Sequence, residues 1–204
     1  MSKNERRKIC STTWPGRHDG TFAELRKLLD EKGVTAPVVL EVGPGAASKY
    51  LAGMLASGDG EKLSPLANRW RAVLRNVDGL IRRIPNCPLH SYEPGELLKF
   101  LPAGAKLTVA DISEPVIRAI EKQYPQVCAR VIDFTCETMD EPVDVVVCFC
   151  VLTRAMRPRE IFENLYQSIR PGGVLVMDAR SRKSFSTAEH VLEEMTGHIW
   201  RKPE

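Results

Sequence analysis

Short apolar runs that alternate with amphipathic segments constrain the fold more than any other feature of this sequence. The predicted strands of the second half span 107–110, 129–132, 143–150, 174–178 and 198–200, and the predicted helices span 114–123, 158–169 and 187–195. Such alternation is typical of a parallel sheet that carries helices on both faces. We therefore predict an α/β fold with a doubly wound, mainly parallel sheet.

The first half of the chain is predicted to enter this sheet through a helix and a short strand. A helix over 21–32 has Thr21 as its N-cap, with Glu24 completing a capping box. The run 37–42 is apolar enough for a buried strand, and a second helix is expected over 46–55.

The composition limits the class of protein. A chain of 204 residues with 43% hydrophobic and 27% charged residues fits a single globular domain over 1–204. The longest apolar run, 145–152, is shorter than the roughly 20 residues that a membrane span needs. The polar segment 1–8 lacks the apolar run of a secretory signal. The six cysteines form no CxxC pair, so we expect no metal site, no structural disulfide and a reducing, cytoplasmic location. A net charge of +3 neither requires nor excludes a nucleic-acid partner.

A glycine-containing turn, Glu41-Val42-Gly43-Pro44-Gly45, ends the first predicted strand. Glycines let a ligand approach the backbone closely, and a helix that begins directly after them offers unpaired N–H groups. In a dinucleotide site these donors hold a pyrophosphate. The carboxylate of Glu41 would repel a pyrophosphate, and it suits a cationic group of a ligand, such as an amino group.

Acids also follow the second and third predicted strands. Asp111 can accept hydrogen bonds from two ribose hydroxyls, and Asp133 can accept one from an adenine amino group. The ring or the backbone of Phe134 can contact the base. Because the carboxyl ends of parallel strands share one edge, these residues are expected to lie in one site.

Together these residues resemble the class I S-adenosylmethionine-dependent methyltransferases over residues 38–178. Glu41-x-Gly43-x-Gly45 looks like the motif that holds the methionine part of the cofactor, and Asp111 looks like the ribose-binding acid. The resemblance implies a Rossmann-like methyltransferase fold that uses S-adenosylmethionine, releases S-adenosylhomocysteine and needs no metal. The cofactor-binding residues that it implies are Glu41, Gly43, Pro44, Gly45, Asp111, Ile112, Asp133, Phe134 and Cys148.

Two features depart from the family pattern. Glu41 and Asp111 are 111 − 41 = 70 residues apart, whereas a βαβ unit needs only about 30 residues. Residues 57–106 are therefore expected to form a helical insertion between the first and second strands, with a strongly periodic helix over 65–84 and more basic than acidic residues. Only 204 − 178 = 26 residues follow position 178. We therefore expect a truncated sheet whose exposed edge a homodimer would cover.

Residues for catalysis and for acceptor binding are less sharply defined. Four residues are candidate general bases: His18, Tyr50, His90 and Tyr92. For each of them, a purely structural role is the alternative. His18 lies in an N-terminal segment that would fold over the cofactor as a lid. Arg154 and Arg157 follow the fourth predicted strand, where they would bind a carboxylate or phosphate of the acceptor.

The expected function is methyl transfer from S-adenosylmethionine to an acceptor, with a small molecule as the leading class and a protein or RNA group as the second. The sulfonium methyl group is already activated, so alignment would supply most of the rate. Two alternatives remain open. One is a nicotinamide-dependent oxidoreductase, against which Glu41 argues. The other is a non-catalytic protein of the same fold that binds RNA or a protein partner through its basic helix.

Overall fold

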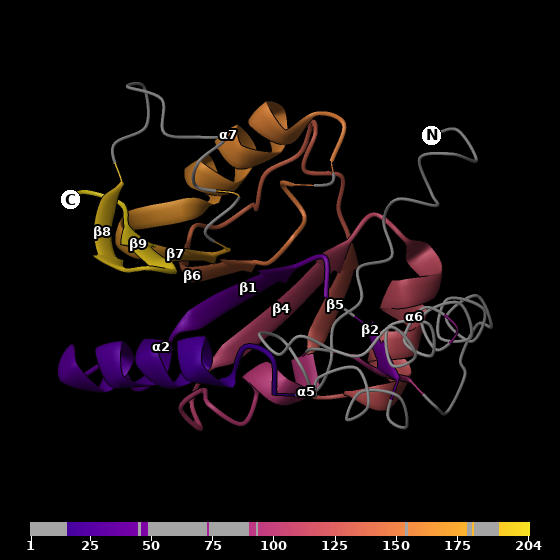
Figure 1. The fold of residues 1–204 in the computed structure, drawn as a ribbon, viewed down its shortest axis with the longest axis horizontal. Helices are drawn as coiled ribbons and strands as arrows, with labels where there is room; N and C mark the ends of the chain where they lie inside the picture. The colour runs from indigo at the N-terminus through magenta and orange to yellow at the C-terminus, as the bar shows by residue number, and fades with distance from the viewer. Residues whose placement is uncertain are drawn as a thin grey trace.

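A seven-stranded sheet forms the centre of the molecule, in the order β5-β4-β1-β6-β7-β9-β8 (Figure 1). The computed structural model describes residues 16–44, 46–48, 73, 90–92, 94–153, 155–178, 181 and 192–204. The strands are β1 (Val38–Val42), β4 (Lys106–Asp111), β5 (Cys128–Val131), β6 (Val143–Cys148), β7 (Ile169–Met177), β8 (Glu193–Thr196) and β9 (Ile199–Arg201). The first five in spatial order pair in parallel, and β9 is antiparallel to both of its neighbours. The predicted mainly parallel sheet is confirmed.

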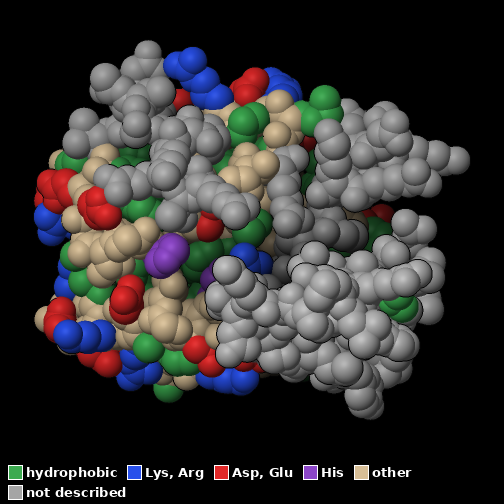
Figure 2. All heavy atoms as spheres, viewed as in Figure 1, with side chains coloured by type: hydrophobic (Ala, Val, Ile, Leu, Met, Phe, Trp, Pro, Cys, Tyr) green, Lys and Arg blue, Asp and Glu red, His purple; other side chains and the backbone are tan. Residues whose placement is uncertain are grey.

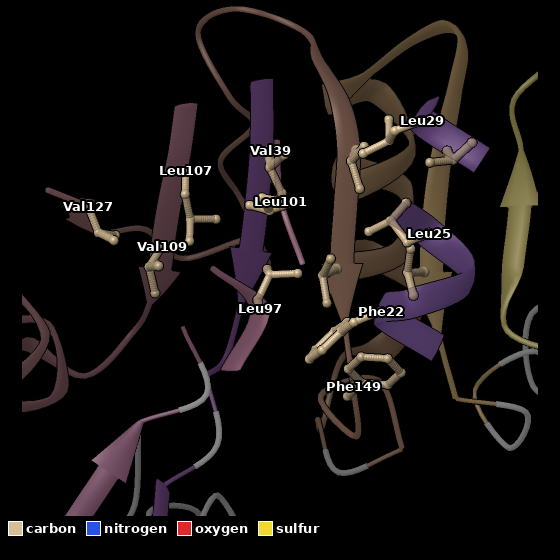
Figure 3. Close-up of a cluster of buried hydrophobic side chains, with 14 of the residues drawn as sticks. Phe22, Leu25, Leu29, Val39, Leu97, Leu101, Leu107, Val109, Val127 and Phe149 are labelled. Carbon is tan, nitrogen blue, oxygen red and sulfur yellow. The ribbon is translucent and has the colours of Figure 1, made fainter. Parts of the chain in front are cut away.

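Helices cover both faces of this sheet. α2 (Asp19–Glu31), α5 (Pro94–Leu97) and α6 (Glu114–Gln123) lie on one side, and α7 (Pro158–Ser168) lies on the other (Figure 1). Because side chains alternate along a strand, β1 directs Val39 to the α2 side and Leu40 to the α7 side. Each face therefore has its own cluster of buried apolar side chains, and Figure 3 shows the cluster on the α2 side.

The start of the first helix differs from the prediction. The backbone N–H of Phe22 donates to the carbonyl of His18, so the helix begins earlier and Thr21 is not its N-cap. Glu24 forms no capping box, because its carboxylate accepts a hydrogen bond from the hydroxyl of Thr196 at 3.1 Å. A contact between distant parts of the chain thus replaces the local one.

The segment after the glycine turn is also different. Residues 46–48, expected to begin a helix, form the strand β2 (Ala46–Ser48), which pairs antiparallel with β3 (His90–Tyr92). Pairing with a segment far along the chain overrides the local helical pattern here. The rest of the expected helix, 49–55, lies outside the described residues.

The C-terminal edge of the sheet is complete, so the expected truncation is wrong. The closing pair β8 and β9 needs few residues, because a two-residue turn joins the strands. Residues 193–195, predicted as the end of a helix, belong to β8, and residues 182–191 lie outside the described part. The edge strand β8 is short and carries the exposed acids Glu193 and Glu194, features that discourage pairing with another chain. The truncated edge therefore no longer argues for a homodimer.

The turn before the last parallel strand is a local irregularity inside β7. Val143 pairs with Ile169 and Val145 pairs with Val174, so the residues between Ile169 and Val174 have no regular partners in β6. Pro171-Gly172-Gly173 forms this irregular stretch.

Most of the predicted insertion over 57–106 lies outside the described residues. Of the expected helix over 65–84, only Val73 is described, in a helical position and 46% exposed. β3 and α5 also fall in this range. Among the described helices, none has the length and apolar character that a membrane crossing requires.

Candidate active site

The strand order reverses between β1 and β6, where ligands of open α/β sheets bind at the carboxyl ends of the strands. From β1 the chain passes to β4 and β5 on one side, and then to β6 and β7 on the other. The loops after β1, β4, β5, β6 and β7 therefore surround one candidate active site.

Glu41 lies near the carboxyl end of β1, between Val109 of β4 and Val147 of β6. It is 2% exposed and shares the α2 side of the strand with Val39. A carboxylate is costly to bury, and carboxylates in such positions are normally paired with a cation or with hydrogen-bond donors. Its place supports the predicted interaction with a cationic group of a ligand.

Gly43 makes the sharp turn after β1. Its φ of +63° lies in the left-handed region that favours glycine, and its N–H donates to the carbonyl of Ala110 at 2.9 Å. An added Cβ would collide with Cγ2 of Val151, which packs directly against the glycine. The turn therefore has no room for a side chain. Pro44 is buried beside it, and Gly45 lies outside the described residues.

Asp111 ends β4 at the same edge of the sheet. Its side chain is 9% exposed, and its Oδ1 accepts the backbone N–H of Ser113 at 2.7 Å. Burial raises the pKa of Asp111 to about 6, an effect that the hydrogen bond from Ser113 only partly offsets. The neighbouring Ile112 is 42% exposed and presents an apolar surface beside the carboxylate.

The raised pKa of Asp111 predicts pH-dependent cofactor binding. Ribose hydroxyls donate to a carboxylate better than to a carboxylic acid, so affinity for S-adenosylhomocysteine should fall as pH falls through 6. At pH 5.5 only about a quarter of the side chain would be ionised, which corresponds to roughly fourfold weaker binding than at pH 7.5. Calorimetric titration at both pH values measures the change. The same titrations with Asp111→Asn should show no such step, and an equal step in that variant would assign it to another group.

Asp133 and Phe134 follow β5 and are engaged in local contacts. Oδ1 of Asp133 accepts both the N–H and the hydroxyl of Thr135, at 2.9 and 2.7 Å. The ring of Phe134 is buried in the cluster on the α7 side, and its carbonyl accepts a hydrogen bond from Asn164. Any contact of Phe134 with a base at the surface would therefore come from its backbone.

Two other predicted residues have clear surroundings. Cys148 is fully buried at the end of β6, with its side chain in the cluster on the α7 side, and burial raises the pKa of its thiol. Arg157 is exposed at the N-cap of α7 and forms an ion pair with Glu160 at 3.0 Å. Tyr50, Arg154 and the side chains of His90 and Tyr92 lie outside the described part.

His18 lies close to the carboxyl end of β6, because its ring stacks on that of Phe149, the residue directly after the strand. The two ring centroids are 3.8 Å apart and the planes are nearly parallel. Phe149 also contacts Phe22 of α2, and Figure 3 shows these two rings side by side. Histidine side chains are visible on the face of the molecule shown in Figure 2. The structure therefore brings His18 to the candidate site, while residues 1–15 of the expected lid are outside the described part.

Burial lowers the pKa of His18 to about 4, and the charges of Arg17 and His198 act in the same direction. We expect its imidazole to stay neutral from pH 7 down to about 5. Titration of the imidazole carbon-bound protons by NMR measures this directly. A midpoint near the ordinary value of 6.5 would show that the ring is solvated rather than stacked.

One functional candidate was missed by sequence reasoning. Asp178 follows β7, and its Oδ2 accepts the backbone N–H of Cys150 after β6 at 2.9 Å. Its position in the sequence was the available signal. Like Asp111 and Asp133, Asp178 is an acid at or just after the end of a strand. No group of His, Cys, Asp and Glu side chains suited to a metal ion occurs among the described residues.

A comparison with protein families agrees with this geometry. Residues 94–175 match the model of a methyltransferase domain, a range that runs from α5 into β7 and includes Asp111 and Asp133. The matched range is less than half of the chain, and over it the chain is similar to a methyltransferase domain.

Several solved structures of methyltransferases are similar to this one. The N-methyltransferase NodS from Bradyrhizobium japonicum WM9, in complex with S-adenosylhomocysteine, is 16% identical, with 99% of this chain and 98% of that chain covered and a TM-score of 0.45. The amino pentose methyltransferase CalS10 from Micromonospora echinaspora is 13% identical, with coverages of 78% and 50% and a TM-score of 0.43. The sugar N-methyltransferase KedS8 from Streptoalloteichus sp ATCC 53650 is 15% identical, with coverages of 80% and 49% and a TM-score of 0.42. No curated protein matches the sequence of this chain.

The described residues at this edge of the sheet fit S-adenosylmethionine, the cofactor expected from the sequence. That cofactor would supply a methyl group that its sulfonium has activated for transfer. Asp111 offers a carboxylate to hydroxyl donors, Ile112 offers apolar surface beside it, and the Gly43 turn exposes backbone without a side chain. Val151 packs on that turn, so the loop after β6 borders the same part of the site.

Proposed function

We propose that this protein is a methyltransferase, which transfers the methyl group of S-adenosylmethionine to a small-molecule acceptor at the carboxyl edge of the sheet. We also propose that 1–204 is one domain in which the 57–106 insertion and the N-terminal segment complete the acceptor pocket. The residues proposed to bind the cofactor are Glu41, Gly43, Pro44, Gly45, Asp111, Ile112, Asp133, Phe134 and Cys148.

The observation that carries this proposal is the placement of two buried carboxylates on neighbouring parallel strands. Glu41 of β1 pairs with Val109 of β4, and Asp111 lies two residues beyond Val109, on the same side of the sheet. The acids are thus adjacent at the carboxyl edge, beside the Gly43 turn. A ligand with a cationic group at one end and a diol next to it can satisfy both.

Each proposed residue has a role that its chemistry supports. Glu41 binds the amino group of the cofactor, and Asp111 accepts hydrogen bonds from the ribose hydroxyls. Ile112 packs on the adenine ring, because an exposed aliphatic side chain beside the ribose acid suits a flat apolar partner. Asp133 binds the adenine amino group through Oδ2, because the contacts with Thr135 use Oδ1.

The acceptor is proposed to bind beside His18 and Phe149. The ring of His18 covers the buried ring of Phe149 at the carboxyl end of β6. A neutral, flat side chain there suits a small flat or apolar group better than a phosphate backbone. With a pKa of about 4, His18 is a weak base at neutral pH. We therefore assign it hydrogen bonding to the acceptor, and we assign the alignment of the acceptor nucleophile with the methyl group to the pocket as a whole.

Calorimetry with S-adenosylmethionine, S-adenosylhomocysteine and NADH tests the cofactor first. Binding of the first two without NADH supports the proposal, and binding of NADH alone would replace it with an oxidoreductase. Transfer of labelled methyl from S-adenosylmethionine to small amines, small phenols, RNA and protein then tests the acceptor class. Labelling of RNA or protein but of no small molecule would contradict a small-molecule acceptor. RNA binding that weakens steeply with salt, in the absence of transfer, would favour the non-catalytic alternative.

A further inference from the structure

Asp178 joins the segments that follow two neighbouring strands. Its carboxylate accepts three hydrogen bonds: from the N–H of Cys150 to Oδ2 at 2.9 Å, from the N–H of Ser181 to Oδ1 at 3.0 Å, and from the Ser181 hydroxyl to Oδ2 at 2.7 Å. Ser181 is fully buried. Both oxygens of Asp178 therefore accept from donors on segments beyond β6 and β7.

The segment that Asp178 holds after β6, residues 149–153, is here called the β6 turn. Cys150 has a φ of +58°, the only positive φ of a non-glycine residue in the described part of the chain. A left-handed conformation costs such a residue about 1–2 kcal/mol, so surrounding contacts must hold it in place. The bond from its N–H to Asp178 and the bond from Thr153 Oγ1 to its carbonyl are two such contacts.

The residues on either side of Cys150 contact the two parts of the proposed site, one for the cofactor and one for the acceptor. Val151 packs on Gly43, in the turn proposed to hold the methionine part of the cofactor. Phe149 stacks under His18, where the acceptor is proposed to bind. A small displacement of Cys150 would therefore alter both contacts together.

We propose that Asp178 is a positioning residue of this methyltransferase, which sets the place of Val151 on the glycine turn and of Phe149 under His18 through the backbone of Cys150. The effect of Asp178 on cofactor binding rests on the proposed function. Asp178 touches neither cofactor nor acceptor in this scheme, and it positions residues through the β6 turn. Its charge also raises the pKa of His18, so the His18 resonances are compared at pH 7.5, where the ring is neutral.

Asp178→Asn in the full-length protein is the direct test. An amide keeps the shape of the side chain but has one accepting oxygen, so one of the donors that now faces a carboxylate oxygen would face an NH₂ group. We expect S-adenosylhomocysteine to bind about tenfold more weakly, a change of about 1.4 kcal/mol. We also expect the NMR resonances of the His18 ring to lose the shift caused by stacking on Phe149.

Asp144→Asn is the matched control at the opposite end of β6. Asp144 also accepts a backbone N–H, that of Val38 at 2.7 Å, and it forms an ion pair with Arg170, but it lies at the amino edge of the sheet. This variant should lose stability in urea while it keeps its S-adenosylhomocysteine affinity within about twofold. Equal losses of affinity in both variants would reduce Asp178 to a general structural role and overturn the proposal.

Two further variants keep the test decisive. Ser181→Ala removes a single donor from Asp178, so it should fold even if Asp178→Asn does not, and it should show a smaller change of the same kind. In a Val151→Ala background, Asp178→Asn should weaken cofactor binding much less than in the wild type, because the two residues act through one contact. Full additivity of the two changes would contradict the proposed route.

The His18 resonances distinguish a failure of this inference from a failure of the proposed function. If the wild type binds no S-adenosylhomocysteine, the proposed function fails, while a shift of His18 in Asp178→Asn but not in Asp144→Asn still supports positioning by Asp178. If the wild type binds it and neither the affinity nor the His18 resonances change in Asp178→Asn, the positioning role is wrong and the proposed function stands.

Discussion

Replacing Asp111 with alanine is expected to weaken binding of S-adenosylmethionine by about 1–3 kcal/mol, the cost of losing a charged hydrogen-bond partner. This corresponds to roughly a 5- to 150-fold higher dissociation constant. The side chain is buried at the end of β4, where its carboxylate accepts one backbone N–H and is proposed to accept the ribose hydroxyls as well. Calorimetric titration of the folded variant measures the loss.

Glu114→Ala is the control for Asp111→Ala. Glu114 lies nearby at the start of α6, is exposed and forms an ion pair with Arg118. Its removal takes away one negative charge close to the site but none of the proposed cofactor contacts, so affinity should change little. If both variants lose affinity equally, the effect is general electrostatics. If Asp111→Ala binds as the wild type does, Asp111 is not part of the cofactor site.

Gly43→Ala is expected to destabilise the protein and to impair cofactor binding. Alanine at a φ of +63° costs about 1–2 kcal/mol, and the new Cβ would overlap Cγ2 of Val151, for which overpacking costs a further ~1–3 kcal/mol. The variant should therefore unfold at a clearly lower urea concentration than the wild type. Relief of the overlap would move the β6 turn or the glycine turn, so S-adenosylhomocysteine should bind more weakly as well.

Gly33→Ala separates the two contributions. Gly33 has a φ of +66°, but an added Cβ there would meet nothing within 4 Å. It should cost only the conformational part, about 1–2 kcal/mol, and should leave cofactor binding unchanged. Val151→Ala combined with Gly43→Ala should recover the part caused by overlap, which a double-mutant cycle isolates. A Gly43→Ala variant no less stable than Gly33→Ala would mean that Val151 does not press on the turn.

The parallel part of the fold could be predicted from the sequence because its signals are local. The helix predicted over 114–123 agrees with α6 residue for residue, since Ile117 and Ile120 mark its buried side and Pro115 marks its first turn. β2 could not be predicted, because its partner β3 lies more than forty residues further along the chain. The start of α2 was misjudged because Glu24 bonds to Thr196 rather than to its own helix.

The candidate site also has residues that the sequence predicts and residues that only the structure brings together. Glu41, Gly43 and Asp111 are recognisable in the sequence, because each stands at or beside the end of an apolar strand. The role proposed for Asp178 depends on bonds to Cys150 and Ser181, which lie on two separate segments. The stacking of His18 on Phe149 likewise joins residues that are far apart in the chain. No periodicity or motif encodes such contacts.

The reversed direction of β9 determines where the described chain ends. Because β9 runs antiparallel to β7, the chain returns to the amino edge of the parallel strands, where Arg201 pairs with Val174. Lys202 donates from Nζ to the carbonyls of Tyr166 and Ile169 at the end of α7. A peptide joined after Glu204 would therefore leave from the edge opposite the site of methyl transfer. An affinity tag, a fluorophore or a surface linker attached there would leave the cofactor and acceptor side open to the solution.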